Sequence, residues 1–287
     1  MHRTKILNTG KAAWIRFRNK SARLYRSFAP ATKRKHFAAK HKKNGIGDVL
    51  DCIITFNEYG VYCVPRSSSH RPAAYKLLSG RVYEPQTIAF MLENCASGDI
   101  IHAGAYFGDF LPALARQIGF NSKIWAFEPN TENYRCAQIT LIMNGISNVV
   151  LSNSAVGASR AESNLTVKDS SGKDLGGAST LITGKPGGSG REQQVTVVPI
   201  DETIPNDRHV SIIQLDVEGY EKEALVGGML TIRRCRPILI LETLPGVKPI
   251  FEDEWFIHNF MDEGYQVSGY LHGNVILKHV IPRKKHA

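Results

Sequence analysis

The chain has 287 residues, 43% of them hydrophobic, so it can bury one large core and carry a smaller appendage. No apolar run reaches the roughly 18 residues needed to cross a bilayer, and the N-terminus lacks the apolar stretch of a secretory signal. Five cysteines, with no CxxC pair, exclude a complete disulfide framework. We therefore expect an intracellular protein, in the cytoplasm or peripheral at the inner membrane face.

The net charge of +10 is concentrated at the N-terminus. Residues 1–43 hold 14 Lys and Arg and no Asp or Glu, which leaves 22 basic and 26 acidic residues and a net charge of −4 for the rest of the chain. Trp14, Phe17, Leu24 and Phe28 follow helical spacing and predict a basic amphipathic helix. We therefore expect residues 1–47 to form a basic helical arm and linker. The arm either docks on the catalytic domain or is attracted to an anionic membrane, a polyanionic glycan or nucleic acid.

The next segment, residues 48–98, precedes the main domain. Two β-rich runs within residues 51–64 flank Asn57-Glu58-Tyr59-Gly60 and predict a β-hairpin. Residues 85–95 have helical spacing, with Pro85 suited to a first helical turn. We expect this helix to lead into the first strand of the main sheet.

Residues 99–287 alternate between strand and helix patterns. Alternation of this kind predicts a mostly parallel sheet covered by helices, and the last predicted elements form an antiparallel hairpin. The predicted strands are residues 100–103, 123–127, 149–151, 194–198, 212–215 and 238–241, the helices 109–118, 131–143, 220–232 and 252–262, and the closing hairpin 265–277.

A glycine-rich segment interrupts this pattern. Residues 169–190 contain seven glycines in 22 residues, with Ser, Lys and Pro among the others. Such a composition predicts a mobile loop that cannot pack a core. The loop is either a surface insertion or a lid over a ligand site.

The first strand is followed by a turn suited to a nucleoside. Gly104 and Gly108 allow a sharp turn and a close approach to the backbone, and Glu128 ends the next strand, where a carboxylate can accept hydrogen bonds from ribose hydroxyls. A dinucleotide site would need G-x-G-x-x-G to admit a pyrophosphate. Since only two glycines flank the bulky Tyr106 and Phe107, the spacing favours S-adenosylmethionine, which has no phosphate.

Two further groups of polar residues follow later strands. Residues 153–157 (NSAVG) offer short polar groups to an adenine edge, although a plain β-turn explains them equally well. Asp216 and Glu218 follow one buried strand and Glu242 ends another, at the sheet edge where ligands of open α/β sheets bind. Asp216 is the first candidate for a general base, with Glu218 or Glu242 as substitutes. The three carboxylates could alternatively hold a divalent cation, which we regard as the minority hypothesis.

Six motifs over roughly residues 80–245 resemble the FkbM methyltransferase family: YEP, HAGAYFGDF, FEPN, NSAVG, LDVEGYE and RPILILE. The resemblance implies a Rossmann-like class I methyltransferase fold and S-adenosylmethionine as cofactor. His102 departs from it, because the family generally has Asp there to help hold the cofactor. His102 could make a substitute contact, Asp109 or Glu84 could take over, or His102 could be a satisfied core residue. The cofactor-binding residues expected from motifs and resemblance together are Glu84, His102, Ala103, Gly104, Ala105, Gly108, Asp109, Glu128, Pro129, Asn130, Asn153, Ser154, Ala155 and Asp216.

The methyl acceptor is not specified by these motifs. The resemblance implies O-methylation of a hydroxyl on a sugar, glycan or natural product. One alternative is an RNA methyltransferase that uses the basic arm, although no RNA-binding module is recognisable, and nucleic acid is therefore not the partner we expect. A second alternative is a membrane-surface protein that retains a cofactor-binding fold. The sequence does not decide whether the chain forms a homo-oligomer.

Overall fold

The computed structural model describes residues 50–182, 191–244 and 246–280. The predicted basic arm and linker (residues 1–47) and residues 183–190 of the glycine-rich segment lie outside the described residues. Within the described ranges, no helix is both long enough and apolar enough to span a bilayer.

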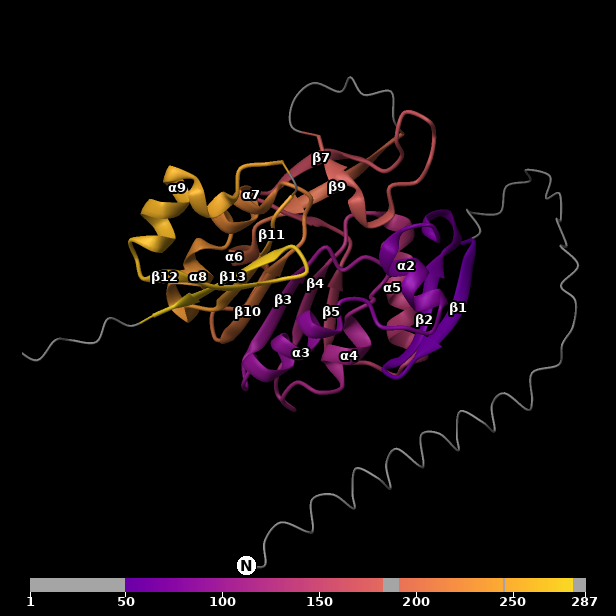
Figure 1. The fold of residues 1–287 in the computed structure, drawn as a ribbon, viewed down its shortest axis with the longest axis horizontal. Helices are drawn as coiled ribbons and strands as arrows, with labels where there is room; N and C mark the ends of the chain where they lie inside the picture. The colour runs from indigo at the N-terminus through magenta and orange to yellow at the C-terminus, as the bar shows by residue number, and fades with distance from the viewer. Residues whose placement is uncertain (1–49, 183–190, 245, 281–287) are drawn as a thin grey trace, which may run out of the picture. The chain divides into compact units, whose positions relative to one another are not determined.

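A seven-stranded sheet forms the centre of the fold (Figure 1). Its order is β12 (Tyr265–Leu271), β13 (Asn274–His279), β11 (Ile238–Glu242), β10 (Val210–Leu215), β3 (Asp99–Ala103), β4 (Ile124–Phe127) and β5 (Val149–Ser152). All neighbouring pairs are parallel except those made by β13 with β11 and β12. This arrangement confirms the predicted Rossmann-like fold with a C-terminal antiparallel hairpin. The chain builds outward from β3 to β5 and then returns to β10, so the topological switch point lies between β3 and β10.

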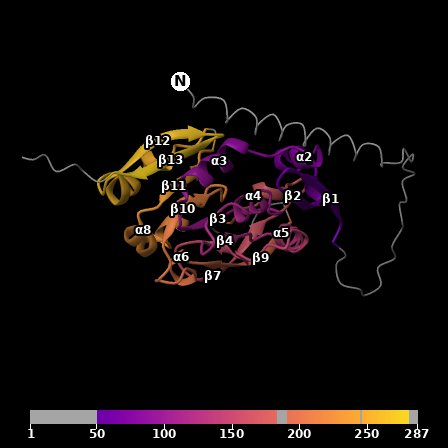
Figure 2. The same ribbon diagram turned by 90° about the horizontal axis from the view of Figure 1, so that it is seen from below.

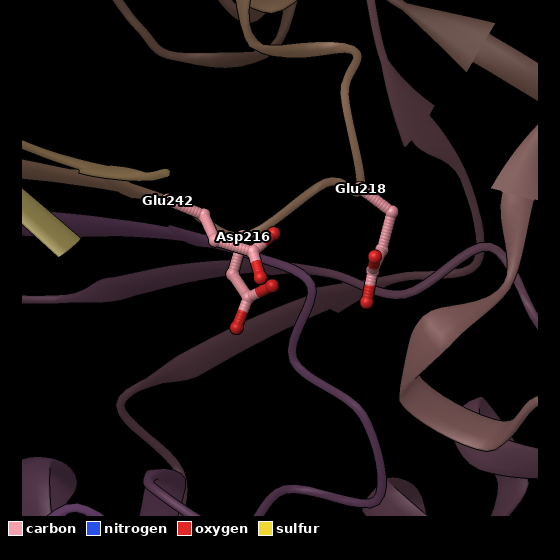
Figure 3. Close-up of side chains that lie close together, drawn as sticks. All are labelled: Asp216, Glu218 and Glu242. Carbon is pink, nitrogen blue, oxygen red and sulfur yellow. The ribbon is translucent and has the colours of Figure 1, made fainter. Parts of the chain in front are cut away.

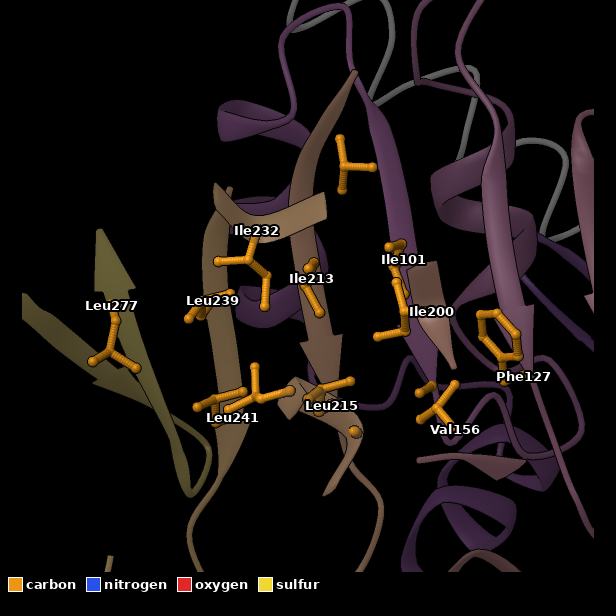
Figure 4. Close-up of a cluster of buried hydrophobic side chains, with 14 of the residues drawn as sticks. Ile101, Phe127, Val156, Ile200, Ile213, Leu215, Ile232, Leu239, Leu241 and Leu277 are labelled. Carbon is orange, nitrogen blue, oxygen red and sulfur yellow. The ribbon is translucent and has the colours of Figure 1, made fainter. Parts of the chain in front are cut away.

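Apolar residues alternate between the two faces of the central strands, which explains why helices cover both. Ile100, Ile212 and Ile240 pack in one core with α3 (Pro85–Asn94) and α4 (Leu111–Ala115). Their neighbours Ile101, Ile213 and Leu239 pack in a second core with α6 (Ile200–Thr203), α7 (Glu221–Val226) and α8 (Met229–Cys235) (Figures 2 and 4). Strands buried on both faces are therefore mostly apolar, as parallel strands in α/β folds are, although β3 and β10 also bury the polar side chains of Asp99, His102 and Gln214.

One predicted strand lies outside the main sheet. The run at 194–198, expected to continue the parallel sheet, is part of β9 (Glu192–Val198) in a separate four-stranded sheet of order β6-β9-β7-β8. Its partners are β6 (Ala155–Val156), β7 (Ala161–Thr166) and, beyond β7, β8 (Thr180–Leu181). The sequence did not reveal β7, because AESNLT is largely polar and only half-buried. Because β7, the partner of β9, has no apolar pattern, the sequence does not indicate which sheet β9 joins.

The described part of the glycine-rich segment, residues 169–182, is packed. A 3₁₀ turn, η2 (Gly176–Ala178), leads into β8, which pairs with β7. Gly176 is buried, and its carbonyl accepts a hydrogen bond of 3.2 Å from the Asn133 side chain. Gly176 is the only buried residue among residues 169–182, and none of these residues belongs to a hydrophobic core cluster, so the described part of the segment pairs with β7 without contributing to a core. Glycine is required here because a Cβ on Gly176, at φ +59°, would approach Ser68 and the Tyr106 hydroxyl to 2.8 Å.

The predicted hairpin is present as β1 (Cys52–Asn57) and β2 (Gly60–Pro65). It is followed by η1 (Arg66–Ser68) and α2 (Pro72–Leu78), a helix the sequence analysis did not predict. The hairpin packs against α5 (Thr131–Met143), where the Cys63 amide donates to the Thr140 hydroxyl at 3.0 Å. This contact brings the turn between η1 and α2 to the edge of the main sheet.

Two predicted helices are interrupted. The helix expected over 220–232 is divided into α7 and α8 at Gly227, where a Cβ would lie 1.9 Å from the Gly157 carbonyl oxygen. The one expected over 252–262 consists of η3 (Ile250–Glu252), α9 (Glu254–Phe256) and the π-helical turn η4 (Ile257–Met261). Neither interruption moves a predicted site residue away from the sheet edge.

Candidate functional site

Two adjoining cavities lie at the switch point, beyond the carboxyl ends of β3 and β10. They share Gly104, Gly177 and Asp216. The first, which we call the apolar cavity, is lined by Ala103, Gly104, Phe127, Glu128, Pro129, Ser154, Ala155, Val156, Leu165, Gly177, Ser179, Leu181, Asp216, Val217 and Tyr220. The second, which we call the acidic cavity, is lined by Arg71, Pro72, Ala73, Tyr83, Glu84, His102, Gly104, Tyr106, Asp109, Phe110, Gly177, Ala178, Gln214, Asp216, Glu218 and Glu242.

Gly104 is the point where the chain turns between the two cavities. Its φ of +86° lies in the left-handed region. A Cβ there would stand 2.0 Å from the carbonyl oxygen of Asp216, whose amide donates to the Ala103 carbonyl at 3.1 Å. Only glycine lets the ends of β3 and β10 approach this closely.

Glu128 presents a buried and tightly held carboxylate at the end of β4. Its two oxygens accept hydrogen bonds from the Tyr106 amide at 2.7 Å, the Asn130 amide at 2.9 Å and the Asn133 side chain at 3.3 Å. Burial raises the pKa of Glu128 to about 8, while each of these donors favours the ionised form. The carboxylate is thus oriented before any ligand arrives.

The predicted cofactor-binding residues fall into two groups. Ten of them line at least one cavity: Glu84, His102, Ala103, Gly104, Asp109, Glu128, Pro129, Ser154, Ala155 and Asp216. The other four, Ala105, Gly108, Asn130 and Asn153, line neither.

These four residues have structural contacts instead. Ala105 is buried in the core with α3 and α4, and a Cβ on Gly108 would contact α5. The Asn130 side chain caps α5 by accepting from the Glu132 and Asn133 amides. The Asn153 side chain donates to the carbonyls of Glu128 and Pro129, at 2.9 and 3.1 Å. They shape the loops that present the lining residues.

His102 is a buried residue with a hydrogen-bond partner on only one of its two ring nitrogens. It is 3% exposed and stacks on Phe110, and its Nδ1 is hydrogen-bonded to Gln214 Oε1, across the β3–β10 pairing. Because a carbonyl oxygen accepts, Nδ1 carries the proton and Nε2 is a free acceptor. Nε2 has no hydrogen-bond partner. Burial lowers the pKa of His102 to about 4, so the ring is neutral at pH 7 and offers a lone pair to the acidic cavity.

Five carboxyl groups line the acidic cavity: Glu84, Asp109, Asp216, Glu218 and Glu242. Burial is the largest cause of the raised pKa of each, and repulsion between them adds to it for Asp109, Asp216, Glu218 and Glu242. The pKa reaches about 7 for Asp109, Asp216 and Glu218, and about 8 for Glu242. Arg71 is the one basic side chain among the lining residues.

Several lining residues were missed by sequence reasoning. Arg71 lies in a Ser/Arg/Pro-rich turn with no functional signature, and the hairpin packing alone brings it to the cavity. Tyr106 adopts φ +49°, donates its hydroxyl to Ser68 at 2.7 Å and lines the acidic cavity. In the sequence, the only indication that Tyr106 has a role was its bulk inside the turn between Gly104 and Gly108. His272, in the turn between β12 and β13, is hydrogen-bonded to Gln86 at 2.6 Å and does not line either cavity.

The ligand-free protein should be more stable at pH 6.5 than at pH 8. A carboxyl whose pKa is about 7 in the folded protein takes up a proton over this interval, whereas the same carboxyl in the unfolded chain stays ionised. Folded protein therefore gains stability as pH falls, by about 1 kcal/mol from Asp109 alone, or a rise in Tm of about 2–4 °C. His102 gains its charge below this window, because burial depresses its pKa.

Calorimetric scans at constant ionic strength measure this difference. The Asp109→Asn variant should show a smaller pH dependence, and Glu93→Gln, an exposed carboxyl on α3, should leave it unchanged. A wild-type Tm that is flat or higher at pH 8 would contradict the expectation.

Comparisons with known proteins agree with the motifs. The family model described as "Methyltransferase FkbM domain" matches residues 102–270, more than half of the chain. None of the curated proteins matches the sequence.

Solved structures of methyltransferases are similar to the chain at low identity. A methyltransferase FkbM from Methylobacillus flagellatus is 19% identical, with a TM-score of 0.43, over 63% of this chain and 43% of its own length. An S-adenosylmethionine-dependent methyltransferase from Aquifex aeolicus is 16% identical, with a TM-score of 0.38, over 69% of this chain and 91% of its own. This chain thus spans less than half the length of the first of these proteins. The assignment rests on the family model: the chain belongs to the FkbM methyltransferase family.

Proposed function

We propose that the chain transfers the methyl group of S-adenosylmethionine to a hydroxyl group on a sugar, glycan or other natural product. The observation that carries this proposal is the position of Asp216, which lines both cavities at the point where they meet. Burial and the neighbouring Glu218 raise its pKa to about 7, a value suited to a group that accepts a proton near neutral pH.

The residues of the apolar cavity fit the nucleoside part of the cofactor. Phe127, Val156 and Leu181 offer apolar surface to a purine, and Ser154 offers a hydroxyl to its edge. The buried carboxylate of Glu128 would accept from the ribose hydroxyls, and three protein donors already hold it in place. Gly104, Gly177 and Asp216 line both cavities, so the methionine part of the cofactor would pass from the apolar to the acidic cavity beside them.

The acidic cavity fits the charged methionine part and the acceptor. Its carboxylates stabilise positive charge, and the neutral His102 offers Nε2 as an acceptor for an ammonium group. His102 could thereby make the contact that Asp makes elsewhere in the family. A cavity with five carboxyl groups disfavours a phosphate backbone, which supports a hydroxyl of a small molecule or glycan over RNA.

When bound, S-adenosylmethionine supplies a methyl group already activated on sulfonium sulfur, and it leaves as S-adenosylhomocysteine with the electron pair of the broken carbon–sulfur bond. The protein then has to orient the acceptor oxygen and receive its proton. Asp216 receives this proton in our proposal, with Glu218 or Glu242 as substitutes. Tyr106, Ala178 and Gly177 also line the acidic cavity.

The proposal is tested by incubating the full chain with methyl-labelled S-adenosylmethionine and a panel of sugars, glycans and hydroxylated natural products. Label in an O-methyl group, located by NMR of the product, is the expected result. Label transferred to RNA, or to nitrogen or carbon of the acceptors and never to oxygen, would overturn it.

A further inference from the structure

Three carboxylates converge at the acceptor side of the acidic cavity. Leu215 on β10 pairs in register with Leu241 on β11, so the residues that follow, Asp216 and Glu242, lie side by side. Glu218 faces them from the loop after β10 (Figure 3), where its φ of +54° turns the chain back. One oxygen from each of the three residues lies within 4.8 Å of the others.

The charge of this cavity is not balanced by the protein. Five carboxyl groups face one guanidinium, that of Arg71, among the lining residues. Like charges a few ångströms apart in a buried site repel strongly, so the groups must hold protons or bind a cation. The ammonium and sulfonium of the cofactor account for part of the missing positive charge. The negative charge of the compact set formed by Asp216, Glu218 and Glu242 remains unbalanced.

Buried acceptors without partners gather at the same edge. In the described part of the chain, five buried side-chain atoms have no hydrogen-bond partner, and three of them are His102 Nε2, Glu242 Oε2 and Asn274 Oδ1. His102, 3% exposed, lines the acidic cavity, and its Nε2 is the acceptor proposed above for the cofactor ammonium, whereas Glu242 belongs to the carboxylate set itself. Asn274, 4% exposed, is the register partner of Glu242 on β13 and does not line the cavity. A buried acceptor without a partner costs about 1–3 kcal/mol, and a missing ion is one explanation for such groups.

We propose that Asp216, Glu218 and Glu242 bind a divalent cation that also takes oxygen atoms of the methyl acceptor. A set of carboxylate oxygens, without Cys, suits hard cations such as Mg²⁺ or Mn²⁺. Three protein ligands leave coordination positions open for two neighbouring oxygens of an acceptor, such as a vicinal diol. The inference that the cation binds the acceptor rests on the proposed function.

The cation would change the chemistry of the site in two ways. It would lower the pKa of a bound hydroxyl, so that a weak carboxylate base suffices. It would also hold the three carboxylates ionised, because a bound cation favours their charged form. A carboxylate that ligates through one oxygen keeps its second, and Asp216 could receive the hydroxyl proton there.

Binding of Mn²⁺ to the full chain, without cofactor or acceptor, tests the proposal. Titration followed by electron paramagnetic resonance, which detects free Mn²⁺, should show one bound equivalent at pH 8. Glu242→Gln and Glu218→Gln should each weaken binding about tenfold or more, since each loses a charged ligand. Glu93→Gln removes an exposed carboxylate outside both cavities and should bind like the wild type.

Two results would overturn the cation site. One is the absence of bound Mn²⁺ in folded wild-type protein, which would favour an acceptor that carries an amino group. The other is equal binding by the wild type, Glu242→Gln and Glu218→Gln, with folding of each checked by circular dichroism. Because this titration needs no S-adenosylmethionine, its outcome is independent of the methyl-transfer assay, and either proposal can fail while the other stands.

Discussion

The Asp216→Asn variant should retain the cofactor and lose about 10²–10⁴-fold in kcat, the usual effect of removing a positioned general base. Asparagine has the same shape but cannot take up the proton of the acceptor hydroxyl. Wild-type kcat should rise with pH through about 7, because burial and Glu218 raise the pKa of Asp216 to that value. This ascending limb should disappear in the variant.

Steady-state kinetics over pH 6–9 without added divalent cation, together with calorimetric titration of S-adenosylmethionine, measure both effects. The matched control Glu93→Gln, which converts an exposed carboxylate to an amide, should leave kcat and its pH profile unchanged. An Asp216→Asn enzyme with wild-type kcat would exclude Asp216 as the base and direct attention to Glu218 and Glu242.

The Glu128→Ala variant should bind S-adenosylmethionine and S-adenosylhomocysteine at least about 100-fold more weakly. Two hydrogen bonds from ribose hydroxyls to a carboxylate are each worth about 1.5–3 kcal/mol, and both are lost. The Tyr106 and Asn130 amides also lose their acceptor, so the Tm should fall. Neither the variant nor the wild type should bind NAD, since the glycine turn lacks the pattern that admits a pyrophosphate.

Calorimetric titration with the two sulfur nucleosides and NAD checks this expectation. Glu132→Ala is a matched control, because Glu132 is a carboxylate on the same segment whose partner is the Ser67 hydroxyl, at 2.7 Å, outside both cavities. Equal affinity of Glu128→Ala and Glu132→Ala for S-adenosylmethionine would remove Glu128 from the cofactor site.

Local patterns in the sequence determine the central sheet. Strands β3, β4 and β10 are mostly apolar because both of their faces are buried, and a glycine or an acid follows directly where the chain leaves the sheet. Such signals depend only on neighbours along the chain. They predicted the parallel core, the closing hairpin, the turn at Gly104 and the acidic residues at the sheet edge.

Contacts between distant segments could not be predicted in this way. The polar sequence of β7 conceals the strand that takes β9 out of the main sheet, and only the packing of the hairpin on α5 brings Arg71 to the acidic cavity. From the sequence, His102 could either contact the cofactor or be a core residue whose hydrogen bonds are all made within the protein. The answer depends on Gln214, 112 residues away, which occupies Nδ1 and leaves Nε2 without a partner.

The sequence by itself determined the family, the sheet and the residue types at its edge, because each depends on short stretches of chain. The tertiary structure decided which of those residues meet. Asp216, Glu218 and Glu242 approach one another because β10 and β11 pair in one particular register, and a shift of one residue would separate them. Register is a property of two strands together, which is why neither stretch of sequence alone could specify the cluster.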